Sequence, residues 1–119
     1  MIGLHRFRKS LVYAWRGLAD VWESEQSFRV HILAFILLMI VIIGLRIKGV
    51  EAAVLILVAA MVIVLELANS IFERWLDIVS PRVGVHVKDA KDIMAATVLV
   101  ASLAALAVGA IIIIPHLKF

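Results

Sequence analysis

The chain has 119 residues, of which 65% are hydrophobic, and its mean hydropathy is +1.12. An ordinary soluble domain is about 45–50% apolar, so this composition excludes a soluble enzyme and predicts an all-α membrane protein. Its length predicts a single domain over residues 1–119, its net charge of +3 favours no partner, and the absence of cysteine excludes disulfides and thiolate metal sites.

Residues 4–27 are predicted to form an amphipathic helix that lies on the membrane surface. Apolar side chains recur there at helical spacing, and basic side chains occupy the other faces. Tyr13, Trp15 and Trp22 have rings that suit the level of the lipid headgroups. This pattern favours membrane lipids with anionic headgroups, and not nucleic acid, as the partner of the basic N-terminal segment.

Each of three apolar segments is predicted to be a transmembrane helix, over residues 28–46, 50–79 and 91–115. The second has only fourteen consecutive apolar residues before Glu66. Because these give about 21 Å of helix, less than the hydrocarbon thickness, the rest of this helix should extend into the cytoplasm. Ser80-Pro81 should end it, and residues 82–90 are predicted to form a polar connection, with the last helix opening near Lys91.

Basic residues are distributed unequally across these segments. If all three span the membrane, nine of the twelve lysines and arginines lie on the side of the N-terminus. By the positive-inside rule, that side is cytoplasmic, which predicts a multi-pass membrane protein with its N-terminus in the cytoplasm. So few helices can hardly enclose a site alone, so we expect an oligomer.

Polar side chains line one face of the second predicted span. At about 100° per residue, they fall within an arc of roughly 100° and are Glu66, Asn69, Ser70, Glu73 and Asp77. Glu66 stands where apolar side chains should still continue, and an acid at membrane depth indicates function by default. Asp77, roughly 16 Å further along the helix, should reach water. A lipid substrate and a soluble nucleotide could therefore meet along this face.

The acidic residues also have structural interpretations. Glu66 could be a buried polar anchor that pairs with a cation, and Glu73 and Asp77 could merely solvate the helix end. Glu25 is either an exposed acid at the end of the surface helix or a ligand of a hard metal together with Glu73. Magnesium suits the second alternative, because it takes one or two carboxylates plus substrate phosphates.

The basic residues nearby are equally open to two interpretations. Lys91 either extends its ammonium group to the membrane surface, with Asp92 or Asp89 capping the helix, or contacts phosphate oxygens. His31 is more typical of a polar residue at the membrane interface than of a ligand. The chain has no glycine-rich phosphate loop, so cations and a metal would have to hold the phosphates of a nucleotide.

The polar face carries the motif Glu66-x-x-Asn69-Ser70-x-x-Glu73-x-x-x-Asp77, followed by Lys91-Asp92. In this motif the chain resembles the prokaryotic diacylglycerol kinase and undecaprenol kinase family of small three-span membrane enzymes. The resemblance covers nearly the whole chain, and further matching positions lie upstream at Arg6, Tyr13, Trp15, Gly17, Glu25, Phe28 and Arg29. It implies a homotrimer with active sites shared between subunits, ATP as the donor, and Mg²⁺.

The resemblance also implies a role for each matching residue. Glu66 is expected to be the general base on the lipid hydroxyl, and Asn69 to orient the substrate and the base. Glu25 and Glu73 are expected to bind the metal. The nucleotide site is expected to include Arg6 and Lys91 as phosphate ligands, with Tyr13, Asp77 and Asp92 lining it.

The predicted function is transfer of the γ-phosphoryl group of ATP to undecaprenol or diacylglycerol at the cytoplasmic interface. Within the family resemblance, His31 and the bulky Phe72 and Trp75 favour undecaprenol. The alternative from another class is a small oligomeric proton-coupled transporter with Glu66 as its exchange site. That alternative leaves the other acids without a role and would place the carboxylate nearer the membrane midplane. A non-catalytic membrane subunit is a third possibility, which the intact polar face disfavours.

Overall fold

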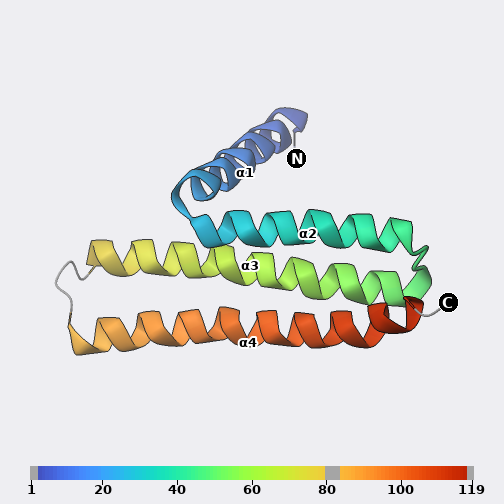
Figure 1. Cartoon of the computed structure of the whole chain (residues 1–119). Helices are drawn as coiled ribbons and strands as arrows, with labels where there is room; N and C mark the ends of the chain where they lie inside the picture. The colour runs from blue at the N-terminus through green and yellow to red at the C-terminus, as the bar shows by residue number, and fades with distance from the viewer. Residues whose placement is uncertain (1–2, 80–83, 118–119) are drawn as a thin grey trace.

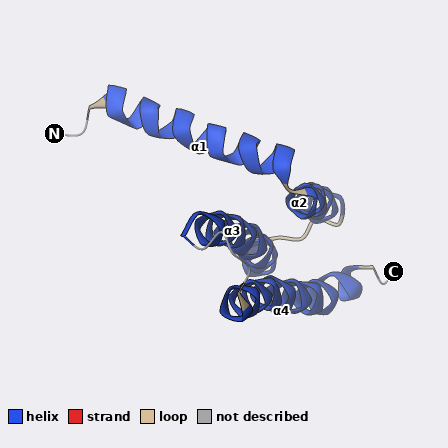
Figure 2. Ribbon diagram, turned by 90° about the vertical axis from the view of Figure 1, so that its left-hand side faces the viewer, coloured by secondary structure: helices blue, strands red, loops and turns tan. Residues whose placement is uncertain are grey.

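The computed structural model describes residues 3–79 and 84–117. Over these residues the chain forms four helices, α1 (Leu4–Ser24), α2 (Gln26–Gly44), α3 (Gly49–Val79) and α4 (Val85–His116). Helix α3 lies between α2 and α4 and packs against both, whereas α1 leaves the bundle at an angle from the start of α2 (Figure 1; Figure 2). Helices α2, α3 and α4 are each long and apolar enough to cross a membrane. The predicted all-α chain with three long apolar helices is confirmed.

The three apolar helices leave most of their apolar surface uncovered by the rest of the chain. Only 6–17% of the apolar window in each helix is buried. Large side chains such as Ile43, Leu106 and Ile111 are at least 70% exposed. Exposed apolar surface on this scale marks a face that lipid or another protein covers.

A compact turn joins α2 and α3 at the end of the bundle away from α1 (Figure 1). The N–H of Ile47 donates to the Ile42 carbonyl at 3.0 Å, and the N–H of Arg46 donates to the Ile43 carbonyl at 3.3 Å. These two bonds form a Schellman cap, which requires the left-handed conformation that Arg46 adopts (φ 55°). Ile42 and Ile47 are buried together with Leu55 of α3. The turn and this small core close the end of the bundle.

The junction between α1 and α2 is a single residue. Glu25 takes an extended conformation (φ −121°, ψ 111°), its N–H donates to the Val21 carbonyl at 2.8 Å, and α2 begins directly after it. Helix α1 therefore ends at Ser24, whereas the sequence predicted a surface helix to about residue 27. Residues 23–27 are all polar, so the pattern of apolar residues gives no position for the bend, and the extended backbone at Glu25 marks it.

Helix α4 begins earlier than the sequence predicted. Gly84 is its extended N-cap, and the helix starts at Val85 and not near Lys91. Residues 85–90, predicted to be part of a polar connection, form its first turns. The polar side chains among them, His86, Lys88 and Asp89, are exposed on the helix, and α3 also continues to this end of the bundle (Figure 1). The predicted helix stop at Ser80-Pro81 lies outside the described residues.

Candidate functional site

The polar face of α3 runs from the buried middle of the bundle to its exposed end. Glu66 is 4% exposed and Ser70 is 2% exposed. Asn69 and Glu73 are half-buried, and Asp77 is exposed. Because these residues recur every three or four positions, they share one side of the helix. A buried carboxylate and an exposed carboxylate therefore stand on the same face of one helix.

Two side chains of α2 meet the carboxylate of Glu66. The hydroxyl of Ser27 donates to Oε1 of Glu66 at 2.7 Å, and Nδ1 of His31 lies 2.9 Å from the same oxygen. Nδ1 is buried and has no aligned hydrogen bond to any of the described residues. Sequence reasoning missed both partners. The available signal was their spacing of four residues, which places them on one face at the start of an apolar helix.

At the exposed end, α4 contributes a lysine. Nζ of Lys91 donates to Oδ1 of Asp77 at 2.8 Å, which joins α4 to α3. Nζ of Lys88, which the sequence did not single out, lies 3.8 Å from Oδ2 of Asp92 one turn away. Because α4 begins at Val85, Lys91 lies within this helix, from which its side chain reaches Asp77 of α3. The structure thus brings together Asp77 and Lys91 of the predicted nucleotide site.

Arg74 of α3, which lies beside the polar face, attaches helix α1 to α3. Its Nη1 donates to Oδ2 of Asp20, and its Nη2 donates to the Ser24 hydroxyl at 2.8 Å. A cavity of about 420 Å³ lies between α1 and α3, and Val21, Ser70 and Arg74 are among its lining residues. No pattern around Arg74 in the sequence indicates a partner on α1, so this attachment was not foreseen.

Two predicted nucleotide ligands lie on α1 and away from α3. Arg6 and Tyr13 are exposed, and the Arg16 guanidinium lies 5.8 Å from the centre of the Tyr13 ring. Within the described part of the chain, no hydrogen bond or ion pair joins Arg6 or Tyr13 to α2, α3 or α4. One copy of the chain therefore does not bring these residues to the polar face.

The predicted metal ligands are two separate carboxylates. Glu25 stands at the junction of α1 and α2, and Glu73 on the polar face, and both are half-buried. Among the described residues, no group of three or more His, Cys, Asp or Glu side chains could hold a metal ion. Oδ1 of Asn69 is a buried acceptor with no hydrogen-bond partner there. These oxygens are of the type that Mg²⁺ prefers, and substrate phosphates would complete its coordination.

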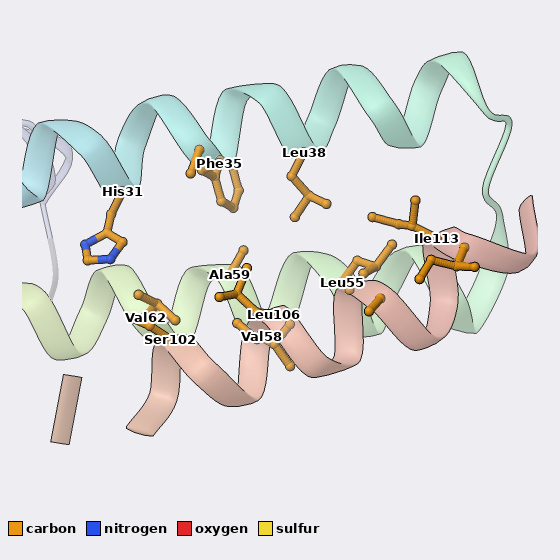
Figure 3. A pocket seen from close by; sticks show the side chains of 15 residues that line it. His31, Phe35, Leu38, Leu55, Val58, Ala59, Val62, Ser102, Leu106 and Ile113 are labelled. Atoms are coloured by element: carbon orange, nitrogen blue, oxygen red, sulfur yellow. The ribbon is translucent and has the colours of Figure 1, made fainter. Parts of the chain in front are cut away.

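An apolar cavity of about 530 Å³ lies between α2, α3 and α4 (Figure 3). It begins at His31 and extends toward Leu55 and Ile113 at the other end of the bundle. Its lining is apolar except for His31 and Ser102. The imidazole of His31 therefore lies between this cavity and the carboxylate of Glu66.

Comparison with known proteins identifies the family. Residues 12–113 match the family described as prokaryotic diacylglycerol kinase. The diacylglycerol kinase of Synechocystis sp. is 32% identical over 109 residues, which are 91% of this chain and 62% of that protein. The diacylglycerol kinase of Escherichia coli is 28% identical and the undecaprenol kinase of Bacillus subtilis 29% identical, each over 114 residues, 96% of this chain and 93% of theirs. This chain belongs to the prokaryotic diacylglycerol kinase family.

Proposed function

We propose that this protein is an ATP-dependent kinase that phosphorylates a membrane lipid alcohol at the cytoplasmic interface. Its family makes it a phosphotransferase with an alcohol acceptor. The observation that carries the proposal is that Glu66, only 4% exposed, shares a helical face with the exposed Asp77. A lipid alcohol approaches from the membrane and a nucleotide from water, so a face that extends from buried to exposed serves both substrates.

In the proposed reaction Glu66 is the general base. Its carboxylate takes the proton of the lipid hydroxyl while the hydroxyl oxygen attacks the γ-phosphorus of ATP. The bond from the γ-phosphorus to the β–γ bridging oxygen breaks, and ADP leaves with that electron pair. Such a transfer requires mainly positioning and neutralisation of charge. The unpaired Oδ1 of Asn69 supports a role in orienting the substrate hydroxyl next to Glu66.

The exposed end of the polar face is the proposed nucleotide site. Lys91, which Asp77 holds, would bind phosphate oxygens, and Asp92 would line the site. Glu25 and Glu73 would hold Mg²⁺, which supplies positive charge to the phosphates when bound. Arg6 and Tyr13 complete the proposed site, and we assign them to the α1 of a neighbouring subunit, since they do not contact the polar face of their own chain.

The lipid chain is proposed to occupy the apolar cavity between α2, α3 and α4. The cavity is apolar along its length, and its one end at His31 adjoins Glu66. This supports a substrate with a hydroxyl group on a long hydrocarbon stem. We favour undecaprenol over diacylglycerol, because the single imidazole of His31 and the apolar bulk of Phe72 and Trp75 provide little for a polar glycerol headgroup.

The proposed assembly is a homotrimer of single-domain subunits in the bacterial inner membrane, with the N-terminus cytoplasmic. Helix α1 would lie on the membrane surface, and its exposed apolar side chains, among them Leu4, Phe7 and Trp15, would face the lipid. Shared sites predict that two inactive variants, Arg6→Ala and Glu66→Gln, recover activity in mixed oligomers. Co-expressed chains that assemble together yet stay inactive would contradict shared sites.

One assay tests the proposed function. Purified protein in mixed micelles receives ATP, Mg²⁺ and either undecaprenol or diacylglycerol, and phosphorylated lipid and ADP are measured together. Equal amounts of the two products are expected, and neither without lipid. The matched control is Glu51→Gln, which removes an exposed acid at the other end of α3 and should leave turnover unchanged. Protein that makes no phosphorylated lipid but moves protons across vesicle membranes would instead support a transporter.

A further inference from the structure

One oxygen of Glu66 lies within hydrogen-bond distance of two polar side chains of α2, Ser27 and His31. Ser27 donates to Oε1 at 2.7 Å, and Nδ1 of His31 lies 2.9 Å from the same atom. No hydrogen bond from the described residues reaches Oε2. We infer that Ser27 and His31 are positioning residues that fix the Glu66 carboxylate through Oε1, so that Oε2 faces the lipid hydroxyl. This inference rests on the proposed function of Glu66 as the base.

The asymmetry of the two oxygens has a chemical consequence. A carboxylate on a long side chain rotates freely unless its oxygens are held, and a general base must be held in reach of the proton that it accepts. Donors on Oε1 restrict this rotation and leave the lone pairs of Oε2 available. Because Ser27 and His31 are one helical turn apart on α2, a rigid element holds both donors.

His31 also connects the carboxylate of Glu66 to the apolar cavity that we propose for the lipid chain. Its Nδ1 is buried without an aligned partner among the described residues, although Oε1 is within hydrogen-bond distance. The torsion of a histidine ring about its second side-chain bond is soft, so a small rotation aligns a proton on Nδ1 with Oε1. The same ring forms one end of the apolar cavity. A hydrocarbon chain in that cavity would contact the ring and favour the aligned orientation.

A purely structural role makes a different prediction. Ser27 and His31 could simply solvate a buried carboxylate, in which case their loss would lower stability and leave turnover per folded molecule unchanged. A positioning role lowers kcat at unchanged affinity, because the misplaced base fails in the chemical step. The separation of kcat from KM therefore decides between the two roles.

The test compares variants that remove each donor with variants that keep it. Ser27→Ala and His31→Leu should each lower kcat about tenfold to a hundredfold, with KM for lipid and for ATP within about twofold of the wild type. Ser27→Thr and His31→Gln retain a donor and should recover most of the loss. The double variant should lose less than the product of the single losses, because both residues act on one oxygen. Thr97→Val, whose lost hydroxyl bonds only to the Ile93 carbonyl, is the control.

Several outcomes would overturn the inference. Wild-type kcat in both Ser27→Ala and His31→Leu would do so, and so would a loss confined to KM. If His31→Leu does not stay folded, His31→Met also lacks a donor at similar volume and gives the same comparison. A Glu66→Gln variant measured in parallel distinguishes failure of the proposed base from failure of the proposed positioning role. If it is inactive while the α2 variants are fully active, the base assignment stands and only the positioning role fails.

Discussion

The two ends of the helical bundle are built differently. At the α2–α3 turn, Ile42, Ile47 and Leu55 are buried together, and the carbonyls at the end of α2 are satisfied by the Schellman cap. At the opposite end, the buried residues of α3 include a carboxylate and a hydroxyl, Glu66 and Ser70. The first end resembles the core of a stable domain. The second keeps polar groups where apolar packing would stabilise the chain more.

Buried polar atoms also distinguish the two ends. Nδ1 of His31 and Oδ1 of Asn69 are buried without hydrogen-bond partners among the described residues. A buried polar group without a partner costs about 1–3 kcal/mol. Most such groups in folded proteins are paired, so those that are not call for an explanation. Here both atoms flank Glu66: Nδ1 of His31 lies 2.9 Å from its Oε1, and we propose that a substrate group pairs with Oδ1 of Asn69.

The largest expected effect is a loss of turnover, without a loss of stability, when Glu66 is replaced. Glu66→Gln should lower kcat by about 10²–10⁴-fold, since the amide keeps the shape and loses the basicity. The variant should remain folded and keep its oligomeric state, which gel filtration in detergent measures. Turnover within a few-fold of the wild type would remove Glu66 from the role of base.

The opposite pattern is expected at the turn end. Ile42→Ala should destabilise the protein by about 2–5 kcal/mol, because it leaves a cavity in the cluster with Ile47 and Leu55. The measurement is the unfolding transition in detergent, with kcat determined well below it. We expect kcat to change by less than about threefold, because the packing defect is remote from the polar face. A large loss of kcat in folded protein would show that the two ends are not independent.

A smaller effect is expected from the carboxylates proposed to bind the metal. Glu73→Ala or Glu25→Ala should raise the Mg²⁺ concentration for half-maximal rate roughly tenfold or more, because a hard ligand is lost. Glu23→Ala, an exposed acid on α1 close to Glu25 in sequence, is the matched control. Titration curves of both variants that overlay the wild type would reduce these acids to surface charges.

The smallest expected effect concerns the lipid. We expect kcat/KM for undecaprenol to exceed that for diacylglycerol by a few-fold, with diacylglycerol turnover still measurable, because apolar contacts discriminate only weakly between substrates. Both values should be measured in mixed micelles at the same mole fraction of lipid. A preference of tenfold or more for diacylglycerol would reverse the substrate assignment and leave the lipid kinase proposal intact.

Sequence reasoning predicted the long helices well because each depends on a local pattern. Apolar runs of helical length indicated α2 to α4, and the 3.6-residue period placed Glu66 and Asp77 on one face. It failed where neighbouring residues or three-dimensional packing decide. His86, Lys88 and Asp89 gave residues 85–90 the pattern of a polar connection, yet these residues are the first turns of α4. A short connection between the first two spans was expected from the sequence, but not the left-handed conformation of Arg46, which glycine usually provides.

The candidate site was predictable residue by residue along α3 but not across helices. The motif identified which side chains share the face of α3, whereas the contact of Ser27 and His31 with Glu66 depends on how α2 packs on α3. Pairing between helices follows from the relative rotation and height of two elements, which a single sequence does not specify. The bond from Arg74 to Asp20 is of the same kind, since it depends on where α1 leaves the bundle.

The single extended residue between α1 and α2 has a mechanical consequence. Glu25 is both the joint of the two helices and a proposed metal ligand, and Arg74 fastens α1 on the far side of that joint. A force that tilts α1 must either break the Arg74 contacts or turn the backbone of Glu25. If α1 lies on the membrane as proposed, bending or thinning of the bilayer acts as a lever on this carboxylate. Such a motion would move Glu25 relative to Glu73, the other proposed metal ligand.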